Sequence, residues 1–153
     1  MTRLLTYLAM ATIALAATAC GRDGGVSLPT APIRTFPAPL PVSPDAIPIV
    51  LGETVTREVT TADRPVATTW GPEPAVRFGV TVPTAGRLRV RVTSAGPGGL
   101  TLWVNAKAFW GSDVEIRGEE LVQANASYEI AVSMHDPRGP SQTFELTTSL
   151  DPQ

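Results

Sequence analysis

The chain has 153 residues, of which 43% are hydrophobic and 17% charged, and its formal net charge is −2. This length suits one domain with an additional segment. The lack of a basic surplus argues against nucleic acid as a partner, because nucleic-acid-binding domains carry clustered positive charge. Cys20 is the only cysteine, which excludes a disulfide within the chain.

The first 19 residues have the layout of an export signal. Arg3 precedes an apolar run over residues 4–16, and the small residues Ala17, Thr18 and Ala19 follow it. The run is shorter than the roughly 20 apolar residues that span a bilayer. We therefore expect residues 1–19 to be removed after export.

This segment resembles a bacterial lipoprotein signal, in which the cysteine becomes the lipidated first residue of the mature protein. The resemblance implies that Cys20 anchors the chain to a membrane through acyl groups such as palmitate, outside the cytoplasm. Gly21 follows the cysteine in place of an aspartate, which implies the outer membrane if the host is Gram-negative. Ala17-Thr18-Ala19 also fits the A-x-A pattern of ordinary signal peptidase, which would release a soluble protein with an unmodified Cys20.

Residues 20–48 are predicted to form an extended linker. Seven prolines lie within the last 20 residues of this segment, at positions 29, 32, 37, 39, 41, 44 and 48. Proline excludes a helix or a central strand and favours the polyproline conformation, which rises about 3.1 Å per residue. The linker could reach on the order of 90 Å when fully extended. Pro37–Pro41 could alternatively be a ligand for an aromatic groove.

From residue 49 to 153 apolar residues recur with period two between turn-forming residues, which indicates β-strands. The expected strands lie at residues 54–60, 76–82, 88–92, 100–104, 114–116, 128–134 and 144–150, with a less distinct one at 66–70. Because every run has one apolar face, a second apolar face must cover it. We therefore predict an all-β domain, an antiparallel β-sandwich of seven or eight strands with jelly-roll or Greek-key connections. Residues 76–82 and 88–92 are expected to form one hairpin.

The domain resembles the bacterial pre-peptidase C-terminal (PPC) family. The blocks that carry this resemblance are Leu51–Val55, Phe78–Pro83, Leu100–Val104, Tyr128–Val132 and Phe144–Leu146. The resemblance implies a small jelly-roll-like sandwich of the kind appended to secreted enzymes as a targeting or substrate-contact module. Some members bind calcium or collagen-like polymers. Acidic residues that often precede the family's strands are missing here, at Pro74–Arg77 and at Gly98-Gly99.

Four arginines are the most concentrated surface feature. Arg87, Arg89 and Arg91 alternate along one strand, and Arg77 is expected on the same face across the hairpin. Guanidinium groups could bind phosphates, sulfates or carboxylates of an envelope polymer. The alternative is a solvated face that acids such as Glu129 or Glu145 neutralise across strands.

Trp103 is the aromatic candidate for a binding surface. It alternates with Leu102 and Val104, so its ring should point away from the core, where it could stack on a sugar or contact another protein. Phe109 and Trp110 are expected to cover one end of the sandwich.

No metal or catalytic motif stands out, and no cofactor is expected. Asp113, Glu115 and Glu119 are weak candidates for a calcium site, with solvated surface acids as the alternative. His135, the only histidine, is expected in a solvated loop, and no G-x-S-x-G, H-E-x-x-H or C-x-x-C motif is present. We therefore expect a non-catalytic, membrane-anchored protein of the cell envelope that binds an envelope protein or takes part in assembly. Alternatives are a module for carbohydrate or cell-wall polymer, and an enzyme or calcium-dependent accessory domain.

Overall fold

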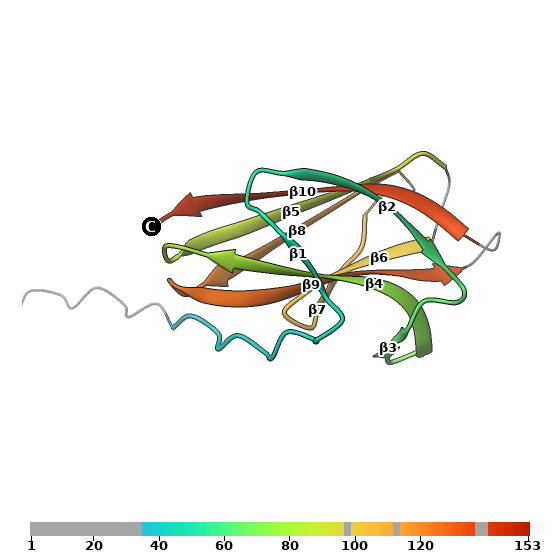
Figure 1. Cartoon of the computed structure of the whole chain (residues 1–153), viewed down its shortest axis with the longest axis horizontal. Coiled ribbons are helices and arrows are strands. Elements are labelled where there is room, and N and C mark those ends of the chain that lie inside the picture. Colours follow the sequence, from blue (N-terminus) through green and yellow to red (C-terminus); the bar gives the residue numbers. More distant parts are fainter. Residues whose placement is uncertain (1–34, 97–98, 112–113, 137–140) are drawn as a thin grey trace, which may run out of the picture. The chain divides into compact units, whose positions relative to one another are not determined.

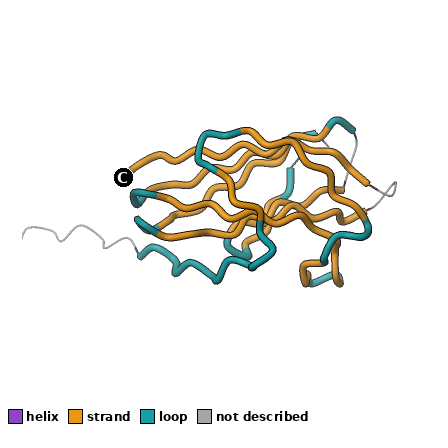
Figure 2. Tube along the Cα trace, in the orientation of Figure 1, coloured by secondary structure: helices purple, strands orange, loops and turns teal. Residues whose placement is uncertain are grey.

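The structure is a computed structural model that describes residues 35–96, 99–111, 114–136 and 141–153. The predicted signal, Cys20 and Asp113 lie outside these ranges. Strands and loops make up the whole described part of the chain (Figure 2). No helix in that part has the length and apolar character needed to cross a membrane.

Ten strands form two sheets that face each other (Figure 1). The strands are β1 (Ile47–Ile49), β2 (Thr54–Thr60), β3 (Pro65–Thr68), β4 (Gly71–Val82), β5 (Gly86–Ser94), β6 (Gly99–Val104), β7 (Lys107–Phe109), β8 (Glu115–Val122), β9 (Ala126–Asp136) and β10 (Ser141–Pro152). The six-stranded sheet has the order β1-β4-β9-β6-β7, with β3 paired to β4, and the four-stranded sheet has the order β2-β10-β5-β8. All pairs are antiparallel except β1 with β4. The predicted antiparallel β-sandwich is confirmed, with the three-residue strands β1 and β7 in addition to those expected.

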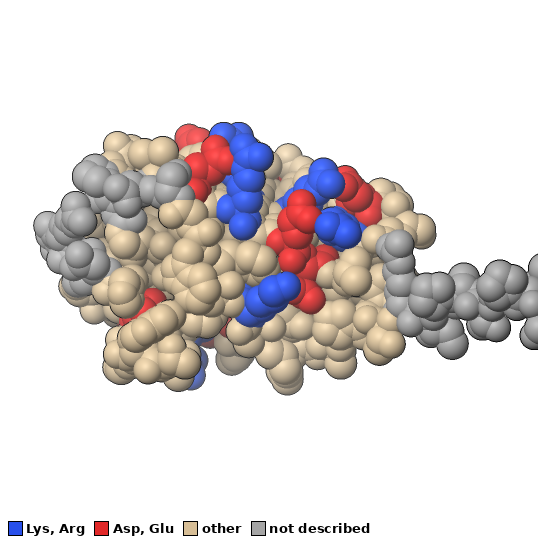
Figure 3. All heavy atoms as spheres, turned by 180° about the vertical axis from the view of Figure 1, so that it is seen from behind, with Lys and Arg blue, Asp and Glu red and all other residues tan. Residues whose placement is uncertain are grey.

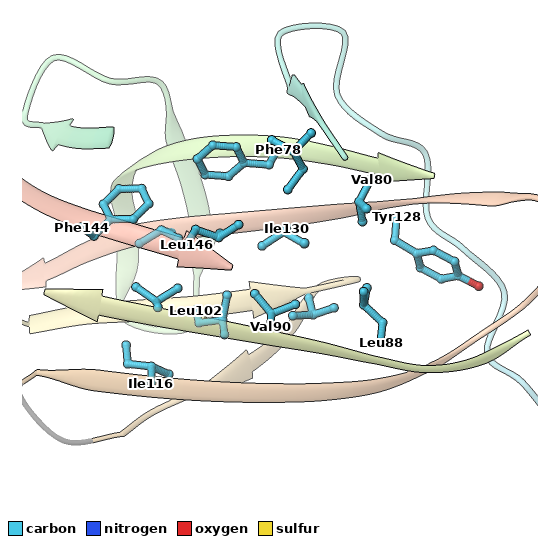
Figure 4. Packing of buried hydrophobic residues seen from close by; sticks show 14 of the residues in the cluster. Phe78, Val80, Leu88, Val90, Leu102, Ile116, Tyr128, Ile130, Phe144 and Leu146 are labelled. Atoms are coloured by element: carbon cyan, nitrogen blue, oxygen red, sulfur yellow. The ribbon is translucent and has the colours of Figure 1, made fainter. Parts of the chain in front are cut away.

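The core lies between the sheets and consists of the residues that the period-two pattern places on one face (Figure 4). Phe78 of β4 and Phe144 of β10 meet edge to face with their ring centroids 6.1 Å apart, so this contact joins the two sheets. Burial of such side chains supplies most of the folding free energy of a sandwich, at roughly 1.5–3 kcal/mol each. Val114, the first residue of the strand expected at 114–116, precedes β8 and is 55% exposed.

The predicted hairpin of residues 76–82 and 88–92 is wrong. β4 pairs with β9 in the six-stranded sheet, whereas β5 pairs with β10 and β8 in the four-stranded sheet. The segment after Val82 therefore crosses from one sheet to the other. Two strands that face each other across a core show the same alternation as two hairpin partners, so the pattern alone could not separate these arrangements.

The described residues that precede β1 belong to the same compact unit as the strands. Residues 35–46, which we call the strap, lie against the six-stranded sheet and lead into β1. Side chains of the sheet bind the strap's backbone: Asn105 Oδ1 accepts from Leu40 N at 2.8 Å, and a Glu129 carboxylate oxygen accepts from Ser43 N at 2.7 Å. Proline removes several backbone donors from this segment, and these contacts satisfy part of what remains.

Candidate functional site

The turn between β3 and β4 presents Trp70 at one end of the sandwich. The Thr68 hydroxyl donates to Gly71 O at 2.7 Å and accepts from Trp70 N at 3.1 Å, which closes the turn. Gly71 has φ = 122°, a conformation that glycine adopts far more readily than other residues. The local sequence Thr-Thr-Trp-Gly therefore holds a large aromatic side chain in a defined turn.

A buried carboxylate connects this hairpin to the last residues of β9. Glu73, 6% exposed, accepts a hydrogen bond from Ser133 Oγ at 2.7 Å through Oε2, and its Oε1 lies 2.8 Å from His135 Nδ1. Ser133 Oγ in turn accepts from Trp103 Nε1 at 2.9 Å. A buried carboxylate is costly unless it is paired in this way, so the network constrains the relative positions of the hairpin, β6 and β9.

Three ring side chains meet above this network. The ring centroids of Trp70 and Trp110 are 5.7 Å apart at an interplanar angle of 76°, and those of Trp70 and His135 are 5.6 Å apart at 66°. Trp70 is 61% exposed and Trp110 is 60% exposed. We call these three residues the tryptophan patch. Exposed apolar surface of this kind often marks an interaction site in soluble proteins.

The tryptophan patch is chemically suited to binding and is not arranged as a catalytic triad. In a triad the serine bonds to the histidine, and the acid holds the far side of the imidazole. Here Ser133 and His135 both bond to Glu73, and Ser133 is completely buried. Because an ionised carboxylate can only accept, His135 Nδ1 carries a proton and Nε2 has a lone pair when the ring is neutral. No hydrogen-bond partner for Nε2 occurs among the described residues.

The structure changes the expected roles of the aromatic residues. Trp103 lies on the outer face of its sheet and is half-buried, at a groove of about 200 Å³ between the strap and β3. It supports Ser133 rather than forming an open platform. Trp110 was expected to cover the end of the sandwich but is exposed, and His135 was expected in a solvated loop but belongs to β9 and contacts Glu73. Sequence reasoning missed Glu73 and Trp70, although a tryptophan directly before a turn glycine was a usable signal.

Arg87, Arg89 and Arg91 share the outer face of β5 as expected, and each one is paired with an acid. Arg87 and Arg89 contact Glu119 at 2.7 and 3.2 Å, and Arg89 also contacts Asp151 at 2.7 Å. Arg91 contacts Glu115 at 2.7 Å. Basic and acidic side chains are interleaved on the face drawn in Figure 3. The hollow of about 450 Å³ beside Arg89 therefore lies within a mixed-charge surface.

Arg77 is not part of that arginine face, because β4 belongs to the other sheet. Its side chain is only 10% exposed, and its Nε lies 3.6 Å from Glu129 Oε1. The guanidinium also donates to the backbone oxygens of Arg64 and Pro65 at 3.0 and 2.8 Å, at the start of β3. Arg77 therefore connects β4 to the start of β3 and has a structural role.

The two described candidates for a calcium site are bound to arginines. Glu115 hydrogen-bonds with Arg117 and Arg91, which lower its pKa, and Arg87 together with Arg89 lowers the pKa of Glu119. Within the part of the chain that the structure describes, no three His, Cys, Asp or Glu residues are grouped so that they could hold a metal ion.

Comparison with known proteins gives structural similarity alone. No family model matches the sequence, and no curated protein matches it either. The fold is similar to the pre-peptidase C-terminal domain of a collagenase from Bacillus anthracis, with a TM-score of 0.54 and 17% identity, covering 73% of this chain and 100% of that domain. A weaker similarity, with a TM-score of 0.45 and 14% identity, is to a periplasmic inhibitor of g-type lysozyme from Aeromonas hydrophila. It covers 69% of this chain and 96% of that protein. The chain folds as a PPC-like β-sandwich, as its resemblance to that family implied.

Proposed function

We propose that this chain is a lipid-anchored extracytoplasmic protein that acts as a non-catalytic binding module and recognises its ligand through the tryptophan patch. The observation that carries this proposal is the exposure of Trp70 and Trp110, 61% and 60%, with Trp70 held in a hydrogen-bonded turn and in ring contact with Trp110. Tryptophan is enriched among the residues that dominate binding free energy. A preorganised side chain such as Trp70 loses little conformational entropy when it binds.

The position of the tryptophan patch suits a tethered protein. The strap begins at the end of the sandwich where Gln123 Nε2 donates to the Phe36 and Pro37 carbonyls, next to the start of β9. His135 lies at the other end of β9, which corresponds to about 30 Å along the strand. A tether that arrives through the strap would therefore enter at one end of the domain and leave the turn between β3 and β4, which carries Trp70, at the other (Figure 1).

The anchor itself is proposed from the sequence. Cys20 follows a short apolar segment with small residues before it, in the pattern of a lipidated residue. Two or more acyl chains would make membrane attachment effectively permanent, since each buried methylene contributes about 0.8 kcal/mol. Fractionation tests this part: Cys20→Ala should move the protein from the membrane to the soluble fraction without altering its fold.

In-cell photo-crosslinking tests the binding role. A photoreactive amino acid at position 69 of the full chain, an exposed site directly before Trp70, should yield discrete adducts, whereas the same group at position 58, an exposed site on β2, should yield none. Adducts from position 69 should disappear when Trp110 is replaced by alanine. Equal labelling from both positions, or none from position 69, would contradict the proposed recognition surface.

A further inference from the structure

We infer that the tryptophan patch binds a glycan that carries N-acetylamino groups. This inference rests on the proposed function and assigns a ligand class to its recognition surface. Three properties of Trp70, Trp110 and His135 lead to it: the area that the two indoles expose, the angle between them, and the hydrogen bonding of the imidazole.

The exposed area matches a short stretch of sugar better than a protein. A tryptophan side chain offers at most about 250 Å² of contact surface, so two that are 61% and 60% exposed present on the order of 300 Å². Stable protein complexes bury about 800 Å² on each partner. One or two pyranose rings cover the smaller area, and their C–H faces stack against aromatic rings.

The two indoles form adjoining walls rather than a flat platform. Their planes meet at 76° with centroids 5.7 Å apart, so a ligand that lies on one ring also approaches the other. A sugar with an acetamido substituent fits such a corner, because the ring face can contact one indole while the acetyl methyl contacts the second. A sugar without this substituent buries less apolar surface there, and burial is worth roughly 25 cal/mol per Å².

His135 supplies the polar contact that distinguishes this ligand. Glu73 holds the Nδ1 proton at 2.8 Å, which leaves Nε2 of the neutral ring as an acceptor beside Trp70. An acetamido N–H is a donor that cannot rotate away from its amide plane, so it pairs with a fixed acceptor at low entropic cost.

A matched pair of tetrasaccharides tests the inference. The full chain in detergent would be titrated with the β-1,4-linked tetramer of N-acetylglucosamine and with the β-1,4-linked tetramer of glucose, following tryptophan fluorescence and heat. We expect saturable binding of the acetylated tetramer and about tenfold weaker binding of the other, since one hydrogen bond and one methyl contact are lost. Equal affinity for both sugars, or no saturable binding of the acetylated one, would overturn the inference.

Variants locate the binding on the tryptophan patch. Trp70→Ala and Trp110→Ala should abolish binding, His135→Ala should weaken it about tenfold, and Trp70→Phe should retain part of it. Val50→Ala is the control, because Val50 is 70% exposed and lies in the connection between β1 and β2. Binding that survives both tryptophan variants would place the sugar elsewhere and overturn the inference.

The inference and the proposed function fail differently. If neither tetramer binds while photo-crosslinking from position 69 still captures a protein, the sugar assignment is wrong and the recognition surface stands. If crosslinking from position 69 yields nothing as well, both fall.

Discussion

Glu73 and His135 are 62 positions apart in the sequence, yet Glu73 Oε1 and His135 Nδ1 lie 2.8 Å from each other. This contact joins the start of β4 to the end of β9 at the place where Trp70 and Trp110 are exposed. The turn that carries Trp70 is therefore held by a buried polar network in addition to its own hydrogen bonds. A site on such a support keeps its geometry before the ligand arrives.

Replacing Glu73 tests whether this network stabilises the fold. Glu73→Ala should lower the free energy of unfolding by about 2 kcal/mol, because Ser133 Oγ loses its buried acceptor and His135 loses its partner. Urea denaturation followed by tryptophan fluorescence measures this. Glu58→Ala, at an exposed position of β2, should change stability by less than about 0.5 kcal/mol. A similar loss in both variants would show that Glu73 has no special role.

Thr148 offers a stabilising substitution. Its hydroxyl is buried in the core, and the described residues give Oγ1 no hydrogen-bond partner. Thr148→Val keeps the shape and removes the unsatisfied oxygen, so the free energy of unfolding should rise by about 1 kcal/mol. Thr147→Val is the matched control, since the Thr147 hydroxyl already bonds to Thr54 Oγ1 and should give no gain. A loss of stability in Thr148→Val would indicate a partner for this hydroxyl.

The turn between β6 and β7 contains two residues with positive φ, Asn105 at 50° and Ala106 at 63°. The left-handed conformation costs an alanine roughly 1 kcal/mol, and glycine adopts it without that cost. Glycine also gives the unfolded chain more entropy, which offsets part of this gain. The net effect of Ala106→Gly should still be a higher melting temperature. Ala108→Gly, within β7, should lower it. Thermal unfolding by circular dichroism compares the two.

The strap should detach when its side-chain contact is removed. Asn105 Oδ1 accepts from Leu40 N, and Asn105 Nδ2 donates to Ala38 O, so Asn105→Gly keeps the turn and deletes both bonds. We expect amide hydrogen exchange of Leu40 to accelerate about tenfold or more. The amide of Val80, in the middle of β4, is the internal reference and should be unaffected. Unchanged exchange at Leu40 would show that other contacts suffice to hold the strap.

Lowering the pH should weaken the ion pairs that Glu119 makes with Arg87 and Arg89. The hydrogen bond from Arg87 lowers the pKa of Glu119 below its ordinary value of 4.5, with a further contribution from Arg89. A lowered folded-state pKa gives stability that is present above the ordinary value and is lost as the pH falls through the folded value. Urea denaturation between pH 6 and pH 3 should show this loss, and Glu119→Gln should show a smaller one. An identical pH dependence in both proteins would mean that this ion pair does not contribute.

The sequence predicts individual strands well, because alternation is a local property. The apolar residues Leu88, Val90 and Val92 recur every second position, and all three are buried. Arg87, Arg89 and Arg91 between them must then face outward. The strap was harder to predict, because proline indicates an extended conformation whether or not a sheet binds it. Gln123, Asn105 and Glu129 supply the contacts, and no local pattern marks them.

By itself the sequence determined the fold class, the face of each strand that enters the core and the presence of a signal-like segment ending at Cys20, since each of these depends on neighbours along the chain. Tertiary structure alone decided that β4 and β5 belong to different sheets and that Arg77 connects β4 to the start of β3. It also decided that Glu73, Ser133 and His135 meet next to two exposed tryptophans. Period-two patterns specify which side of a strand is buried but not which strand lies beside it. Contacts between distant strands depend on that pairing, and the tryptophan patch is made of such contacts.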